Sequence, residues 1–157
     1  MLLHHALFNQ ASDRPEAQAL SDGRMTQTYS DLAAATIQTA NALSAVDHGP
    51  RERVAVYLDK RLDTVHALFG TAHAGGVFVP VNPLLKAEQV AYILRDCNVR
   101  ILVTSPDRLA SLADALPDCP DLHSVLVLGE AADEQRIGPV RILSWQALLD
   151  AADPTTG

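Results

Sequence analysis

Residues 53–104 read RVAVYLDKRLDTVHALFGTAHAGGVFVPVNPLLKAEQVAYILRDCNVRILVT, in which apolar runs alternate with segments of helical period. The apolar runs cover residues 54–58, 77–81 and 99–103, with fewer than twenty residues between each and the next. A crossover between parallel strands needs about a dozen residues or more, so the spacing is typical of parallel pairing. Pro80 has no N–H, so the second strand should be irregular or lie at a sheet edge there. The segment predicts an α/β fold, with a largely parallel sheet and helices on both of its faces.

Within this segment, the two helices between the strands have their own apolar stripes and stop signals. The first stripe comprises Val65, Leu68, Phe69 and Ala72, and the second comprises Val90, Ile93, Leu94 and Cys97. Gly75-Gly76 ends the first helix, because a left-handed residue at a helix end costs glycine little.

The sequence on the amino-terminal side predicts a helix, a hairpin and a second helix. We expect the first helix over residues 2–12 and hairpin strands over 18–21 and 25–28. Asp22-Gly23 in the intervening turn tolerates a positive φ. Ser30 is expected to cap the next helix by accepting a backbone hydrogen bond. The apolar arc of that helix contains Leu32, Ala33, Thr36, Ile37, Ala40 and Leu43.

The sequence on the carboxyl-terminal side continues the α/β pattern. Ser105-Pro106 predicts a helix start, since proline suits the first helical position. The stripe of that helix is Leu109, Leu112, Ala113 and Leu116, and Pro117 ends it. Further strands are expected over residues 125–128 and 140–143, a mobile loop over 131–138 and a terminal helix over 145–151. We therefore expect residues 1–157 to form one α/β domain.

The composition bounds the function. The 157 residues are 48% hydrophobic, which argues against disorder, and a formal charge of −7 argues against a nucleic-acid surface. No window approaches the length of a membrane span, and the start has no basic region of a signal peptide, so a cytoplasmic location is expected. Cys97 is expected to be buried on its helix and Cys119 to lie in a loop. The spacing of these two cysteines does not indicate a metal site or a disulfide.

Four motifs, in this order and spacing, carry a resemblance to a known family. They are TYSDL at residues 28–32, GPRERVAV at 49–56, AGGVFVPVNP at 74–83 and AYILRD at 91–96. Together they resemble the N-terminal part of AMP-forming acyl-CoA synthetases, in the adenylate-forming superfamily that includes luciferases and nonribosomal peptide adenylation domains. YLDKR at 57–61, with NPLLK at 82–86, is most similar to acyl-CoA ligases found beside exosortase systems. The resemblance runs from about His5 to about Leu149.

The resemblance implies an ATP-dependent ligase that activates a carboxylic acid as acyl-adenylate and transfers it to CoA, with Mg²⁺ offsetting the phosphate charge. In that family a Ser/Thr/Gly-rich loop ending in a lysine holds the ATP phosphates through backbone N–H groups. Residues 1–157 contain no such loop, nor the family's ribose-binding aspartate and catalytic lysine. We therefore expect a front portion of such an enzyme, inactive alone and binding none of these cofactors by itself. Its expected partners are the remaining subdomains and a carboxylic acid, and an exposed apolar face is expected to allow self-association.

Local chemistry nominates few site residues, and the sequence identifies no catalytic, cofactor-binding or metal-binding residue. Lys60-Arg61 near a helix start indicates either an anionic partner or a solvated pair offset by Asp59 and Asp63, with the solvated pair favoured. Asn82-Pro83 lies beyond the carboxyl end of a strand, where open parallel sheets bind ligands. This pair indicates a turn or a pocket wall.

The histidines are not in a metal-binding pattern. His66 and His73 are seven residues apart on one helix, whereas metal ligands on one helix are usually three or four apart, so packing roles are favoured over zinc. His4-His5 is expected to be solvated.

Two other interpretations remain open. The chain could belong to a nonribosomal peptide adenylation domain, whose substrate is an amino acid. It could also be a stand-alone, non-catalytic α/β domain that binds a partner.

Overall fold

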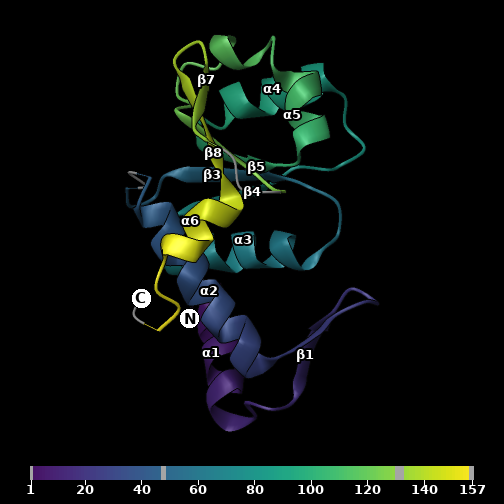
Figure 1. Ribbon diagram of the computed structural model, residues 1–157, viewed down its shortest axis with the longest axis vertical. Coiled ribbons are helices and arrows are strands. Elements are labelled where there is room, and N and C mark those ends of the chain that lie inside the picture. The colour runs from purple at the N-terminus through teal and green to yellow at the C-terminus, as the bar shows by residue number, and fades with distance from the viewer. Residues whose placement is uncertain (1, 47–48, 130–132, 156–157) are drawn as a thin grey trace.

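A six-stranded, mostly parallel sheet forms the centre of the molecule (Figure 1). The computed structural model describes residues 2–46, 49–129 and 133–155. The strand order is β4-β3-β5-β6-β8-β7, and every neighbouring pair is parallel except β7–β8. In that order the strands are Val77–Pro80, Arg53–Tyr57, Val99–Thr104, Ser124–Val127, Val140–Ser144 and Gln135–Ile137. The predicted parallel pairing of the first four strands is confirmed.

Helices cover both faces of this sheet, as predicted (Figure 1). The helices are α1 Leu3–Asp13, α2 Tyr29–Ser44, α3 Leu62–His73, α4 Ala87–Asp96, α5 Pro106–Leu112 and α6 Trp145–Ala151. Helices α4 and α5 lie on one face, and α2, α3 and α6 lie on the other. The hairpin of β1 (Gln18–Ser21) and β2 (Thr26–Thr28) projects from the end of the molecule where α1 lies.

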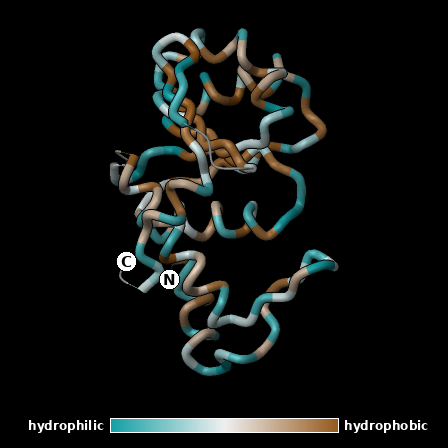
Figure 2. The backbone as a smooth tube through the Cα atoms, viewed as in Figure 1, coloured by the Kyte–Doolittle hydropathy of each residue, from teal (hydrophilic) through white to brown (hydrophobic). Residues whose placement is uncertain are grey.

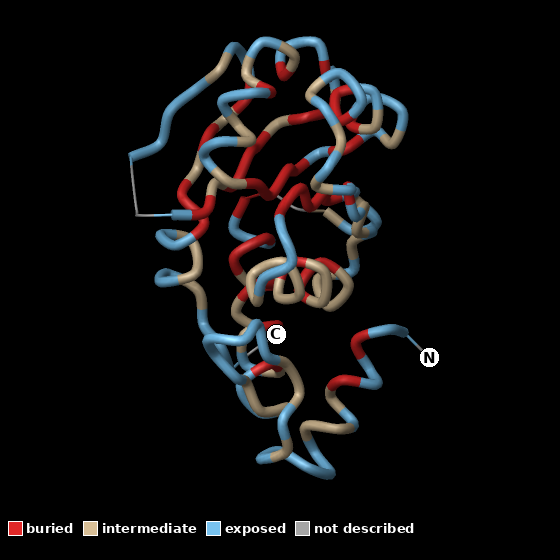
Figure 3. Tube along the Cα trace, turned by 90° about the vertical axis from the view of Figure 1, so that its right-hand side faces the viewer, coloured by how far each residue is buried: buried red, intermediate tan, exposed pale blue. Residues whose placement is uncertain are grey.

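Side chains alternate along the central strands to supply two hydrophobic clusters. On β3, Ala55 and Tyr57 face α4 and α5, whereas Val54 and Val56 face α2 and α3. Because both faces are covered, the central strands are largely apolar and buried, and they appear brown in Figure 2 and red in Figure 3.

The sheet edge at β4 agrees with the sequence. Pro80 is paired with Val56 of β3, and the other side of β4 is open. Gly75 ends α3 with φ +83, and the Gly76 N–H donates to the Thr71 carbonyl at 2.9 Å, as expected for a glycine stop. The α4 stripe is also as predicted, with Val90 and Leu94 buried.

The predicted cap of α2 is wrong. Thr28, not Ser30, begins the helix: its hydroxyl accepts from the Asp31 N–H at 3.1 Å, and the Asp31 carboxylate accepts from the Thr28 N–H at 3.0 Å. This reciprocal pair satisfies two backbone donors at once. A cap on Ser30 would satisfy only one donor, so the helix starts two residues earlier.

The predicted apolar stripe of α3 is only half-buried, whereas Ala67, Gly70 and Thr71 are buried completely. The small residues allow a close approach of α2: a Cβ on Gly70 would lie 2.4 Å from Thr39 Cγ2. Close packing against α2 therefore buries the face of α3 that carries small residues, and not the predicted apolar stripe.

Two boundaries in the last third of the chain also differ from expectation. Residues 135–137 of the predicted mobile loop form β7, which pairs with β8 through a turn at Gly138 with φ +58; residues 131 and 132 lie outside the described part. Helix α5 ends at Leu112, and Leu116 lies in a separate 3-10 turn over Leu116–Asp118. Ser105 caps α5 as predicted.

Candidate functional site

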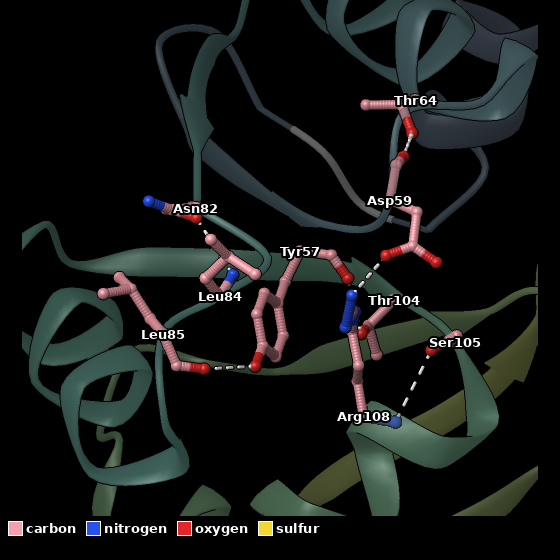
Figure 4. Close-up of polar contacts among 9 residues, drawn as sticks. All are labelled: Tyr57, Asp59, Thr64, Asn82, Leu84, Leu85, Thr104, Ser105 and Arg108. Carbon is pink, nitrogen blue, oxygen red and sulfur yellow. Dashed lines mark hydrogen bonds and ion pairs between the residues drawn. The ribbon is translucent and has the colours of Figure 1, made fainter.

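The carboxyl ends of β3, β4 and β5 meet at one edge of the sheet, which we call the carboxyl edge (Figure 4). It comprises the loop after β3 at residues 59–61, the loop after β4 at 82–86 and the start of α5 at 105–108. This is the edge at which open parallel sheets bind ligands. The sequence predicts Asn82-Pro83 beyond the carboxyl end of a strand and Lys60-Arg61 near a helix start, and the structure brings both pairs to this edge.

Tyr57 connects these segments from beneath. Its ring is 4% exposed, and its hydroxyl donates to the Leu85 carbonyl at 2.7 Å. The Tyr57 carbonyl accepts from the hydroxyl of Thr104, a residue with no exposed surface, at 2.8 Å. Buried polar groups are costly unless paired, so these two bonds fix β3, β5 and the loop after β4 relative to each other.

Arg108 covers this network from the first turns of α5 (Figure 4). Its guanidinium carbon lies 4.8 Å from the centroid of the Tyr57 ring, in range for a cation–π contact. The same guanidinium forms an ion pair with Asp59, whose side chain is 77% exposed. Sequence reasoning missed Arg108, because nothing in the order of residues shows that α5 meets the loop after β3.

The loop after β4 is both a turn and a pocket wall, so both interpretations of Asn82-Pro83 hold. The Asn82 side chain accepts from the Leu84 N–H at 2.9 Å, a local turn typical of asparagine. Asn82 and Pro83 also line a pocket of about 240 Å³ together with Val56, Leu58, Asp59, Lys60, Thr64, Leu68, Pro80 and Val81. This pocket lies between α3 and the carboxyl ends of β3 and β4.

Lys60 and Arg61 differ in their surroundings. Arg61 pairs with Asp63 at 3.2 Å, as the solvated interpretation expects. Asp59, the other expected counter-charge, is paired with Arg108 instead. Lys60 lines both the pocket beside Asn82 and a second pocket of about 410 Å³ that reaches the β1–β2 hairpin.

The helix histidines have packing roles. His66 Nε2 lies 2.8 Å from the Gln27 side-chain oxygen, and its pKa is lowered mainly by burial. The His73 ring packs 4.9 Å from that of Phe8 and 5.3 Å from that of His4. Burial also lowers the pKa values of His73 and His4. The expectation that His4 is solvated is wrong: it is 7% exposed, because α1 docks its ring against α3.

Both cysteines are free thiols: Cys97 is half-buried, and Cys119 is 3% exposed at the end of the 3-10 turn. Burial raises the pKa of the Cys119 thiol, so it is not an activated nucleophile. Across residues 2–46, 49–129 and 133–155, no three potential metal ligands gather in one place.

A mainly apolar pocket lies on the α5 side of the sheet. It measures about 400 Å³ and is lined mainly by α5, β6, β7 and β8, including Leu109, Ala113, Val127 and Ile142. The sequence does not indicate this pocket, because it predicts a loop where β7 lies.

Four polar side chains at the carboxyl edge already have partners within the chain. Asp59 and Asp63 are paired with arginines, and the Tyr57 and Thr104 hydroxyls are bound to carbonyls. These four side chains are therefore used within the fold, where their bonds hold the loops and strands of this edge together.

No helix in the described part of the chain is long and apolar enough to cross a membrane.

The parallel α/β sheet and a family match over most of the chain identify it as the N-terminal part of an adenylate-forming enzyme. The family model "AMP-binding enzyme" matches residues 7–151, so the chain belongs to the AMP-binding enzyme family. Among curated relatives, tyrocidine synthase 3 of Brevibacillus parabrevis is 33% identical over 129 residues, covering 80% of this chain and 2% of that protein. Syringomycin synthase SyrB1 of Pseudomonas syringae pv. syringae is 31% identical over 140 residues, covering 87% of this chain and 22% of that protein.

Solved structures agree on the fold. An anthranilate CoA ligase in complex with anthranoyl-AMP superposes with a TM-score of 0.88 at 24% identity, covering 99% of this chain and 29% of that one. A benzoate CoA ligase from Burkholderia xenovorans superposes with a TM-score of 0.79 at 23% identity, covering 100% of this chain and 31% of that one. The chain therefore spans less than a third of the length of these relatives and structures.

Proposed function

We propose that this chain is the first segment of an ATP-dependent ligase that joins a carboxylic acid to the thiol of CoA through an acyl-adenylate. In that reaction the carboxylate attacks the α-phosphate of ATP and releases pyrophosphate, and the thiol then displaces AMP. The observation that carries the proposal is the family match over residues 7–151, together with the fold likeness to CoA ligases. ATP, Mg²⁺ and CoA belong to the whole enzyme.

Within that enzyme, residues 1–157 act as one α/β unit that supplies structural support and a wall beside the acid-binding pocket. Tyr57, Thr104 and Arg108 hold the carboxyl edge together, and Asn82 and Pro83 present the small pocket beside it. The half-buried stripe of α3 and the open edge at β4, where Val77 is 46% exposed, are surfaces for the remaining subdomains to cover. By itself the chain is expected to self-associate through these surfaces.

A nonribosomal peptide adenylation domain is the second candidate. The observation that favours it is the identity of 31–33% to tyrocidine synthase 3 and syringomycin synthase SyrB1. Both candidates form an acyl-adenylate, so they differ in the acid and in the thiol that receives it.

Pyrophosphate–ATP exchange tests the proposal with a panel of fatty, aromatic and amino acids. The 157-residue chain is expected to give no exchange above a heat-killed control, because it lacks donors placed around the α-phosphate. The product of a longer reading frame, if the gene encodes one, is expected to exchange. Preference for a fatty or aromatic acid with CoA as acceptor supports the ligase; preference for an amino acid supports the peptide synthetase. Exchange by the short chain overturns the assignment of a supporting role.

A further inference from the structure

The amino ends of the parallel strands carry a cluster of arginines that the proposed function does not use. Arg51, Arg53 and Arg100 line a pocket of about 270 Å³ with Pro50, Glu52, Asn98 and Asp121. This amino-edge pocket lies at the opposite end of the strands from Tyr57 and Arg108, because Arg53 begins β3 and Arg100 is near the start of β5.

None of the three arginines forms an ion pair with any described residue, although the chain as a whole carries a charge of −7. The two carboxylates of the pocket have other partners. Glu52 accepts from the Gly49 N–H at 3.0 Å, and Asp121 accepts from the Asn98 side-chain amide at 2.9 Å. The three arginines therefore share the pocket with two carboxylates that already hold a backbone N–H and a side-chain amide in place.

An unfavourable backbone conformation places Arg51 in this pocket. Residues 49–52 form a tight turn, which is closed by a hydrogen bond from the Glu52 N–H to the Gly49 carbonyl at 3.3 Å. Pro50 is the second residue of this turn and Arg51 is the third. Arg51 has φ +62, in the left-handed region that favours glycine at this position of a turn. A non-glycine residue in this conformation is strained, and such residues concentrate at functional sites.

A second irregularity places Arg100. In the β3–β5 pair, Arg53 is opposite Val99 and Val54 is opposite Ile101, so Arg100 is an extra residue without a partner on β3. Bulges of this kind redirect a side chain and are enriched beside functional sites. Arg51 in the turn and Arg100 in the bulge are distant in sequence. Both nevertheless lie at the end of the sheet where Arg53 begins β3.

We propose that the amino-edge pocket binds a compact anion that carries phosphoryl groups. Guanidinium groups match phosphoryl oxygens in geometry and form paired, charge-assisted hydrogen bonds with them. The pocket is smaller than a typical site for a drug-sized molecule, so it suits one or two phosphoryl groups better than a segment of acidic peptide. This site is separate from the carboxyl edge and goes beyond the ligase function.

The test uses the 157-residue chain, with inorganic pyrophosphate as the probe and isothermal titration calorimetry as the measurement. Wild type is expected to bind pyrophosphate, and Arg53→Ala or Arg100→Ala is expected to weaken binding about tenfold, the loss of one charge-assisted contact. Arg24→Ala, which removes an exposed arginine at the hairpin tip, is the matched control and is expected to leave binding unchanged. Higher salt is expected to weaken binding in wild type.

Arg51→Gly separates a binding role from a structural one. It relieves the left-handed strain, so the variant is expected to melt at a higher temperature than wild type while binding pyrophosphate several-fold more weakly. A stabilised variant that binds less cannot owe its loss to unfolding.

Three results would overturn the proposal: no pyrophosphate binding by wild type, equal weakening by Arg24→Ala, or undiminished binding by all three pocket variants. Displacement of pyrophosphate by a hexaglutamate peptide at lower concentration than by phosphate would also overturn it, in favour of an acidic protein partner.

Discussion

The two ends of the parallel strands both carry arginine, but the arginines are used differently. At the carboxyl edge, Arg108 stacks on Tyr57 and pairs with Asp59, and the hydroxyls beneath it are bound to carbonyls. At the amino edge, Arg51, Arg53 and Arg100 have no ion-pair partner among the described residues. Topology alone directs a search for ligands to the carboxyl edge, whereas these three arginines lie at the other end of the strands.

This difference separates stability from binding capacity. A network whose donors and acceptors are already paired stabilises the fold and has little left for a ligand. The three amino-edge arginines are unpaired within the described part of the chain, and two of them lie at backbone irregularities, so they stabilise the fold less than the paired network does. Their hydrogen-bond donors remain available to a ligand. Substitutions at the carboxyl edge should therefore destabilise the chain, and substitutions at the amino edge should not.

The largest expected effect is that of Tyr57→Ala. The change removes a buried ring, its hydrogen bond to the Leu85 carbonyl and the surface on which Arg108 stacks. Truncation of a buried aromatic residue costs about 3–5 kcal/mol in free energy of unfolding, measured by urea denaturation. Tyr57→Phe keeps the ring and should cost about 1–3 kcal/mol through the unpaired carbonyl. If Tyr57→Ala costs no more than an exposed substitution, the carboxyl edge is not a stabilising network.

Thr104→Val should have the next largest effect. Valine keeps the shape of the side chain but removes the hydroxyl that donates to the Tyr57 carbonyl at 2.8 Å. The site has no exposed surface, so water cannot replace the bond, and the loss should be about 1–2 kcal/mol. Thr104→Ser keeps the donor and serves as the control. A serine variant less stable than the valine variant would mean that the methyl group, not the hydrogen bond, matters at this position.

At the amino edge, Arg51→Gly should raise the free energy of unfolding, whereas the substitutions at the carboxyl edge lower it. The strain relieved at φ +62 exceeds the flexibility that glycine adds to the unfolded chain, so stability should rise by about 1 kcal/mol. For a chain of this size that is a rise of roughly 2–4 °C in Tm, measured by differential scanning calorimetry. Arg51→Ala keeps the strain and should give no such rise. Destabilisation by Arg51→Gly would show that the Arg51 side chain supports the fold, which removes the contrast between the two ends.

The sheet and its helices could be predicted from sequence because their signals are local and strong. Residues 54–58, 77–81 and 99–103 are apolar apart from Arg100, as is typical of strands that are covered on both faces. The helical stripes between them indicate crossover connections, and therefore parallel strands. Strand β7 was missed because Gln135–Ile137 is short and mostly polar, and it exists only as the partner of β8. Thr28 and Ser30 are both suitable caps, and only the position of Asp31 decides between them.

The two arginine arrangements were missed for a different reason. Arg108 meets Asp59, and Arg53 lies near Arg100, only through the pairing of β3 with β5, which brings together residues from separate motifs. A positive φ is not expected for an arginine such as Arg51, and the charge of Arg100 within its apolar run does not show that it is an unpaired bulge residue. Lys60-Arg61 and Asn82-Pro83 could be singled out from the sequence because each pair is contiguous, but only Asn82-Pro83 could be assigned to the carboxyl end of a strand.

The smallest expected effect is that of Asp59→Asn, which removes the counter-charge of Arg108. Because the Asp59 side chain is 77% exposed, water and salt screen the pair, and the free energy of unfolding should fall by less than about 1 kcal/mol. A double-mutant cycle with Arg108→Met, which keeps an apolar stem over Tyr57, measures the coupling between the two charges. Coupling should shrink further at 1 M salt, where the screening length is about 3 Å. A coupling of several kcal/mol that resists salt would mean that Asp59 is a structural element as important as Tyr57. In that case the carboxyl edge depends on charge as well as on buried hydrogen bonds, and a ligand that competes for Arg108 would loosen the loop after β3.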